Sequence, residues 1–151
     1  ADYQENQISI VYDTMWNATR RMAEAIADGI RDADPSITVK LFSASKTDKT
    51  DIITEVFRSR AVLMGSPTVN NGYLYAIAGI LELIRGAKLK KKKAAAFGSY
   101  GWSGEAVKLM NEELTKAGFE VVDDGFRTTW APDEDVLAKL REFGSAFVGK
   151  L

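Results

Sequence analysis

An apolar run that starts at Ala94 leads into the stretch Phe97-Gly98-Ser99-Tyr100-Gly101-Trp102-Ser103-Gly104-Glu105-Ala106, where a helical pattern starts at Ser103. In an α/β protein, an apolar run followed by a small-residue loop and a helix marks the carboxyl end of a strand. This loop carries two aromatic residues, Tyr100 and Trp102, beside glycines that leave the backbone N–H groups accessible. Because ligands of open α/β sheets bind at the carboxyl ends of the strands, the loop is a candidate binding segment.

Short apolar runs alternate with amphipathic stretches along the rest of the chain. Strands are predicted at residues 8–12, 37–42, 61–65 and 94–98, with a fifth strand position shared by 119–122 and 125–130. Helices are predicted at residues 17–33, 48–57, 73–84, 103–117 and 133–148. This alternation predicts a single α/β domain over residues 1–151, a three-layer sandwich with a five-stranded parallel sheet and helices on both faces.

The strand order follows from two observations. Crossovers between parallel strands are right-handed, and the second strand has one polar face, which suits the edge of a sheet. Both favour the order 2-1-3-4-5, whose topological switch point lies between strands one and three. The loops after strands one, three and four should therefore converge on one crevice.

Composition excludes several classes of function. The chain has 151 residues, a net charge of −1, and neither cysteine nor histidine. Disulfides, thiol catalysis and imidazole catalysis are therefore excluded, and we assign no metal site, no catalytic residue and no nucleic-acid partner. No apolar run reaches the ~18–20 residues of a membrane span, and there is no signal-peptide core, so we expect a cytoplasmic protein without a membrane partner.

The first candidate loop, Asp13-Thr14-Met15-Trp16-Asn17-Ala18-Thr19, leads from strand one into a helix. Hydroxyl and amide side chains beside free helix N–H groups suit a phosphate dianion. Helix capping by Thr14 or Asn17 explains the same residues equally well. The loop is neither a P-loop nor a dinucleotide fingerprint, because it has no Gly-Lys-Ser/Thr and no G-x-G-x-x-G.

The second candidate loop is Ser66-Pro67-Thr68-Val69-Asn70-Asn71-Gly72, and its residues suit a tight turn. An ordinary strand-to-helix turn would account for this loop alone. In the loop after strand four, Tyr100 and Trp102 offer a surface on which a flat ring can stack. Together the three loops describe a pocket for a flat, phosphorylated aromatic ligand, and FMN is the candidate.

These residues resemble a known family. Tyr12-Asp13-Thr14-Met15 with Thr19, the segment Ser66–Asn71, and the segment Gly98–Glu105 are similar to the flavodoxin domain of flavodiiron proteins, which include flavorubredoxin-type nitric oxide reductases and oxygen reductases. The resemblance implies a flavodoxin-like fold that binds FMN and transfers electrons to a di-iron centre. By position, it implies that FMN contacts Thr14, Met15, Trp16, Asn17, Ala18, Thr19, Ser66, Pro67, Thr68, Val69, Asn70, Asn71, Ser99, Tyr100, Gly101, Trp102, Ser103 and Gly104.

Family members also carry an N-terminal domain with a di-iron centre, for which this chain has neither the histidines nor the length. We therefore expect an excised or free-standing flavodoxin-like domain, with residues 1–6 as a remnant of a linker. The resemblance implies a rubredoxin or a flavin reductase as electron donor and a di-iron domain as acceptor, with homo-oligomers possible in the full-length context. Whether the chain is itself an enzyme stays open.

Two other functions remain as alternatives. An FMN-dependent NAD(P)H:quinone-type reductase would share the fold and the cofactor, and a non-redox interaction module would share only the fold. A response-regulator receiver is disfavoured, because Gly65-Ser66 stands where its phosphoacceptor aspartate would end strand three.

One charge run completes the pattern: Lys88, Lys90, Lys91, Lys92 and Lys93 precede the fourth strand. The pattern predicts a solvated turn at the amino edge of the sheet, with a docking surface for an acidic redox partner as the alternative.

Overall fold

The computed structural model describes residues 4–14, 17–68, 72–87, 92–100, 105–129 and 133–151. Its strands are β1 (Glu5–Tyr12), β2 (Thr38–Ser43), β3 (Ser59–Gly65), β4 (Lys93–Tyr100), β5 (Glu120–Val121) and β6 (Phe126–Thr129). Its helices are α1 (Ala18–Ala33), α2 (Lys49–Arg58), α3 (Tyr75–Ala87), α4 (Glu105–Lys116) and α5 (Glu134–Val148). None of these helices is both long enough and apolar enough to cross a membrane.

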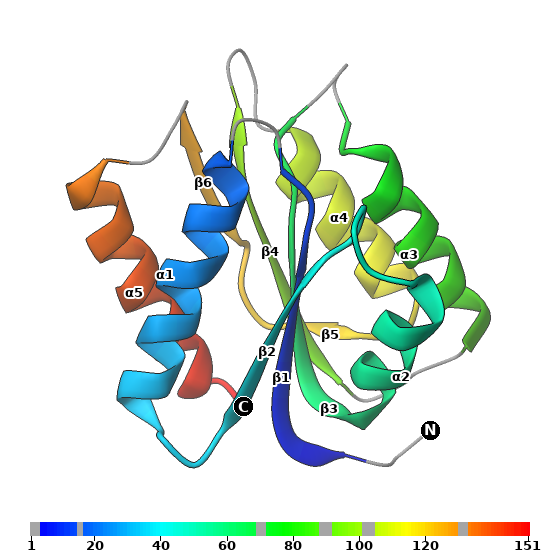
Figure 1. Ribbon diagram of the computed structural model, residues 1–151, viewed down its shortest axis with the longest axis horizontal. Helices are drawn as coiled ribbons and strands as arrows, with labels where there is room; N and C mark the ends of the chain where they lie inside the picture. The colour runs from blue at the N-terminus through cyan, green and yellow to red at the C-terminus, as the bar shows by residue number, and fades with distance from the viewer. Residues whose placement is uncertain (1–3, 15–16, 69–71, 88–91, 101–104, 130–132) are drawn as a thin grey trace.

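All strand pairs in the sheet are parallel, and the order β2-β1-β3-β4-β5 confirms the prediction. The fifth strand position is shared, as expected, by two short strands that both pair with β4. Lys93 of β4 lies opposite Glu120 of β5, and Phe97 lies opposite Phe126 of β6. The carboxyl ends of β1, β3 and β4 therefore lie side by side, at the top of Figure 1.

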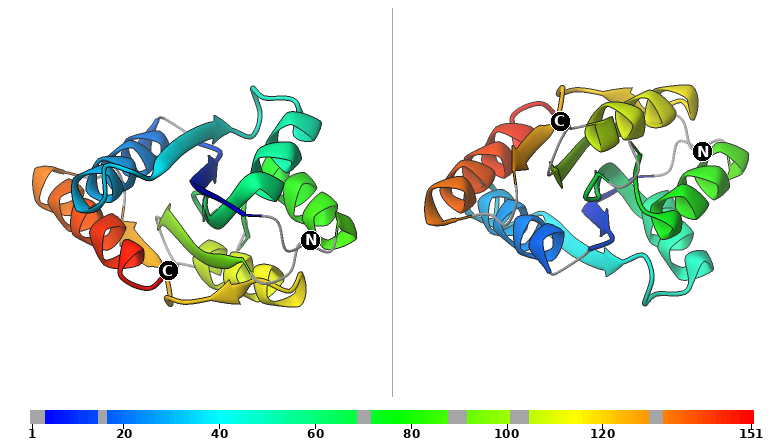
Figure 2. Two further views of the ribbon diagram at one scale, coloured as in Figure 1. Left: turned by 90° about the horizontal axis from the view of Figure 1, so that it is seen from below. Right: turned by 90° about the horizontal axis from the view of Figure 1, so that it is seen from above.

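Helices cover both faces of the sheet, which makes the three-layer sandwich (Figures 1 and 2). Alternate residues of the central strands point to opposite faces. Ile8 and Ile10 of β1 pack with α1 and α5, whereas Val11 packs in the core under α2, α3 and α4. Each face of the sheet thus has its own hydrophobic core. The buried polar side chains lie towards the amino and carboxyl ends of the strands, which we call the amino edge and the carboxyl edge of the sheet.

The amino edge differs from the prediction. Two central strands start earlier than their apolar runs do: β1 begins at Glu5 rather than Ile8, and β3 at Ser59 rather than Ala61. Polar side chains at these starts are buried and bond to each other: Gln7 Nε2 donates to Ser59 Oγ at 3.0 Å, and Ser9 Oγ lies 2.7 Å from the same atom. A hydropathy pattern misses strand residues of this kind.

The expectation of a solvated turn is wrong for Lys92, which is fully buried. Its Nζ donates to the carbonyl oxygens of Phe57 at 2.8 Å and Ser59 at 2.6 Å, which lie at the carboxyl end of α2. Burial lowers the pKa of the Lys92 amine. Lys93 belongs to β4 and pairs with Glu120 at 3.0 Å, whereas Lys88, Lys90 and Lys91 lie outside the described residues.

Candidate functional site

Backbone hydrogen bonds join the three predicted loops at the carboxyl edge of the sheet. The N–H of Asp13, after β1, donates to the carbonyl of Gly65 at 3.1 Å. The N–H of Thr68, after β3, donates to the carbonyl of Ser99 at 2.8 Å. The described parts of these loops therefore meet, which confirms the convergence that the strand order predicts.

The first loop enters α1 through an unusual residue. Asn17 precedes the helix with φ 60° and ψ 9°, in the left-handed region that asparagine tolerates better than most residues. Its side chain makes no capping hydrogen bond, so capping by Asn17 does not explain the sequence of this loop. The first N–H groups of a helix have no partner inside it, and the Asn17 side chain does not bond to them.

Thr19, in this first turn, is a fully buried residue. Its hydroxyl oxygen has no hydrogen-bond partner in the described part of the chain. A buried hydroxyl without a partner costs about 1–3 kcal/mol, so such a group is rare unless something else bonds to it. The orphaned hydroxyl at a helix N-terminus fits a phosphate group, which accepts hydrogen bonds from hydroxyl and N–H donors.

Asp13 holds the start of this loop, a role that the sequence reading missed. The residue is only 8% exposed, and its Oδ1 accepts hydrogen bonds from the Thr14 N–H and the Ser45 hydroxyl, both at 3.0 Å. These bonds connect the loop after β1 to the segment after β2. The signal available in the sequence was an aspartate directly before a hydroxyl residue, which often bonds to nearby backbone N–H groups.

The second loop is fastened on both sides. Ser66 is fully buried, and its Oγ accepts from the N–H of Leu74 at 2.9 Å. The hydroxyl of Thr68 accepts from the N–H of Ala106 at 3.2 Å, in the first turn of α4. Thr68 thus supplies, from another segment of the chain, a cap for the helix that follows the third loop.

Gly98 allows β4 to approach this loop closely. A Cβ atom at Gly98 would lie 2.1 Å from the carbonyl oxygen of Ser66, which is a severe clash with the backbone. Only glycine therefore permits the observed spacing of the second and third loops at this point.

The structure describes eight of the eighteen predicted site residues with their side chains. Those brought to the carboxyl edge are Thr14, Asn17, Ala18, Thr19, Ser66, Pro67, Thr68 and Ser99. The backbone of Tyr100 forms the last residue of β4. The predictions for Met15, Trp16, Val69, Asn70, Asn71, Gly101, Trp102, Ser103 and Gly104 lie outside the described residues.

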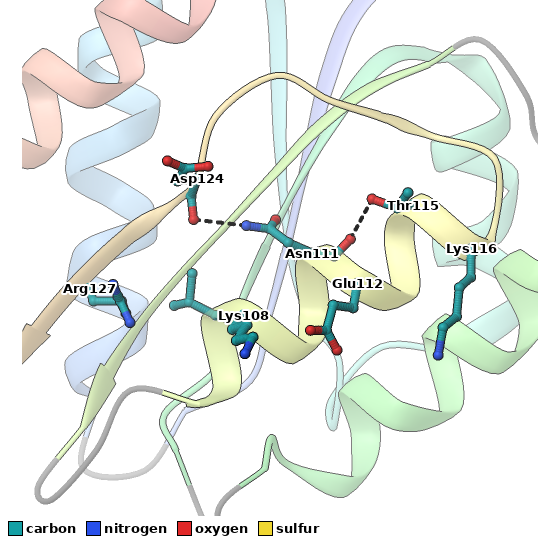
Figure 3. Close-up of a pocket in the computed structure, with 8 residues that line it drawn as sticks. Lys108, Asn111, Glu112, Thr115, Lys116, Asp124 and Arg127 are labelled. Carbon is teal, nitrogen blue, oxygen red and sulfur yellow. Dashed lines mark hydrogen bonds between the residues drawn. The ribbon is translucent and has the colours of Figure 1, made fainter.

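A separate groove of about 580 Å³ lies between α4 and β6 (Figure 3). Its lining includes Lys108 and Asn111 of α4 and Arg127 of β6, and none of the predicted site residues. The Asn111 amide donates to the backbone carbonyl of Asp124 at 2.9 Å, so this side chain ties α4 to the segment before β6. The groove is thus distinct from the phosphate-like site at α1.

The doubly covered parallel sheet, with its order 2-1-3-4-5 and an anion-compatible helix N-terminus after β1, defines a flavodoxin-like domain. The profile of the flavodoxin family matches residues 10–144, most of the chain. The chain belongs to the flavodoxin family.

Several similar proteins are larger than this chain. Anaerobic nitric oxide reductase flavorubredoxin of Vibrio vulnificus is 52% identical over 143 residues, which cover 95% of this chain and 29% of the relative. Among solved structures, rubredoxin oxygen:oxidoreductase from Desulfovibrio gigas is 35% identical with a TM-score of 0.90, over 98% of this chain and 37% of that one. The flavodiiron protein from Giardia intestinalis is 30% identical with a TM-score of 0.92, over 98% and 36%. The chain therefore corresponds to the flavodoxin part of such proteins and spans about 30% of the curated relatives' length.

Proposed function

We propose that this domain binds FMN non-covalently at the carboxyl edge of its sheet and transfers electrons. The orphaned hydroxyl of Thr19 carries the proposal, because it is a buried donor that the described part of the chain leaves without a partner. It lies at the N-terminus of α1, where the helix dipole also favours an anion. Membership of the flavodoxin family supports FMN as the phosphorylated ligand.

In this proposal the residues of the chain bind and orient the cofactor. Thr19 and the first N–H groups of α1 donate hydrogen bonds to the phosphate, and Asp13 keeps the loop before them in place. Ser66 to Asn71 border the ring and the ribityl chain, and Tyr100 and Trp102 close the other side. FMN would supply one- and two-electron chemistry, and the protein would tune it through burial and hydrogen bonding.

We further propose that the electrons come from a rubredoxin-type donor or a flavin reductase and pass to a di-iron oxygen or nitric oxide reductase centre on another domain. The names of the similar proteins support this context, as does the fraction of their length that this chain covers. A cytoplasmic location fits the same setting. Quinone-type reductase activity and a non-redox interaction role remain as the two alternatives.

Fluorescence titration of FMN with the apo-domain, with riboflavin in parallel, tests the proposal. Strong quenching of FMN and much weaker binding of riboflavin would support both the cofactor and the phosphate site. Binding of neither flavin would contradict the proposal and favour the interaction module. Steady-state turnover of the loaded domain with NADH and a quinone would instead favour the quinone-type reductase.

A further inference from the structure

The first turn of α1 has a charge that opposes its helix dipole. In α2, α4 and α5 the first turn contains an acidic residue, which the dipole favours. The first turn of α1 contains no acidic residue, and Arg20 and Arg21 are the third and fourth residues of this helix. Positive charge at a helix N-terminus is unfavourable unless an anion lies beside it.

Arg20 is placed where it can reach such an anion. It occupies the third helical position, from which a side chain can extend back to the N-cap residue. Side chains of a helix also tilt toward its N-terminus. The guanidinium can therefore approach the N–H groups that begin α1.

The surroundings of Tyr12, the last residue of β1, indicate the same location. Burial raises the pKa of the Tyr12 hydroxyl, and the positive charge of Arg20 lowers it, whereas the carboxylates of Glu24 and Asp13 raise it further. Arg20 and Asp13 thus both act on the carboxyl end of β1. The guanidinium therefore lies near the start of the first loop.

Arg20 has a partner in the structure, but this pair is weak. Its Nε lies 3.2 Å from Oε1 of Glu24, and both side chains are 56% exposed. An exposed pair of this kind contributes little to stability and is screened by salt. A phosphate, by contrast, can accept two parallel hydrogen bonds from a guanidinium. Arg20 can therefore exchange Glu24 for a phosphate at little cost.

Independent evidence for an anion comes from the preceding residue. Thr19 is fully buried, and its hydroxyl has no hydrogen-bond partner in the described part of the chain. Thr19 is a neutral donor, so it does not distinguish a charged ligand from an uncharged one by charge. Arg20 adds a full positive charge to the same helical turn.

We propose that Arg20 is a specificity-determining residue of the cofactor site, which leaves Glu24 to bind the phosphate of the flavin and so favours a phosphate monoester over an uncharged ligand. The inference rests on the proposed function, because it assigns a further residue to the same site. Arg20 is not among the residues that the family resemblance implies.

The test is fluorescence titration of FMN and riboflavin with the apo-forms of the wild type, Arg20→Gln and Arg21→Gln. Arg21 is the matched control, since it is the adjacent exposed arginine but lines the groove between α1 and α5 with Leu137 and Arg141. At low ionic strength we expect Arg20→Gln to bind FMN roughly tenfold more weakly, with a flatter dependence on salt. Riboflavin binding should not change. Arg21→Gln should stay within about twofold of the wild type for both flavins.

A third variant, Arg20→Lys, keeps the charge and should recover most of the lost FMN affinity. Equal FMN affinities for the wild type and Arg20→Gln would overturn the inference while leaving the proposed function intact. Equal losses in Arg20→Gln and Arg21→Gln would also overturn it, because they would show only the general field of the helix. A wild type that binds no FMN would overturn both the proposed function and this inference.

Discussion

The buried polar groups at the two edges of the sheet differ in one respect, which concerns Thr19. At the amino edge, Gln7, Ser9, Ser59 and Lys92 are buried, and each makes at least one hydrogen bond within the chain. At the carboxyl edge Asp13 and Ser66 are bonded in the same way, but the buried hydroxyl of Thr19 has no hydrogen-bond partner in the described part of the chain. The first arrangement stabilises the fold, whereas the second leaves a donor that a ligand can use at a cost in stability. The difference supports the proposal that the ligand binds at the carboxyl edge.

Replacing Gly98 by alanine should lower the free energy of unfolding most, because it disrupts the packing at the carboxyl edge. The new Cβ would lie 2.1 Å from the carbonyl oxygen of Ser66, and a backbone atom cannot move aside cheaply. We expect a loss of about 3 kcal/mol in the free energy of unfolding, measured by urea denaturation.

Gly86→Ala is the matched control, since a Cβ there meets nothing within 4 Å. Gly86 lies in α3, so this change should stabilise the domain by up to about 1 kcal/mol. If Gly98→Ala were as stable as the wild type, the close contact of the loops would be refuted.

Lys92→Met breaks the amino edge. It keeps a side chain of similar length but removes the donor to the carbonyls of Phe57 and Ser59, and we expect a loss of about 2 kcal/mol. Lys93→Met, which removes only a partly exposed ion pair with Glu120, should cost less than about 1 kcal/mol. Equal losses in the free energy of unfolding would show that the buried Lys92 stabilises the fold no more than the partly exposed Lys93.

The pH dependence of the free energy of unfolding, compared between the wild type and Lys92→Met, provides a second test. Burial lowers the pKa of Lys92 in the folded state, so between that value and the ordinary lysine pKa the unfolded state binds more protons. The stability of the wild type relative to Lys92→Met should therefore increase as the pH rises from neutral towards the ordinary lysine pKa. Denaturation at several pH values measures this, and a decrease over that range would contradict the burial of Lys92.

Thr68→Val should lower the free energy of unfolding least, and it changes only the carboxyl edge. It removes the acceptor for the N–H of Ala106 while keeping the shape of the side chain, at a cost of about 1 kcal/mol. Hydrogen exchange of the first turn of α4 should accelerate. Thr115→Val, which removes a hydroxyl bond within α4 at an exposed position, is the control and should leave that first turn unchanged.

The sequence allows much of the architecture and of the carboxyl edge to be predicted. Strand order follows from the handedness of crossovers and the polar face of the second strand, and once the order is known the three loops must meet. The contacts with FMN that the resemblance implies remain predictions.

The contacts that the sequence does not reveal join segments far apart in the chain. In the sequence, Lys92 belongs to a lysine run that indicates a solvated turn. In the structure, its amine donates to a carbonyl oxygen at the end of α2. Likewise, the sequence places Asp13 and Thr68 in candidate loops but does not show that they bond to Ser45 and to the N–H of Ala106. Hydropathy and spacing carry no information about such partners, which only the tertiary structure determines.

The central claim is that the carboxyl edge keeps a buried donor free for a phosphate, and Thr19→Val tests it most directly. The free energy of unfolding is measured on the apo-protein, and the dissociation constants of FMN and riboflavin are measured by separate titrations. Thr19→Ser, which keeps the hydroxyl, is the control. We predict that the valine variant is more stable by about 1 kcal/mol, because it no longer buries a hydroxyl without a partner. It should also bind FMN at least about tenfold more weakly, with riboflavin binding unchanged. A valine variant that is less stable, or that binds FMN as tightly as the wild type, would contradict the account.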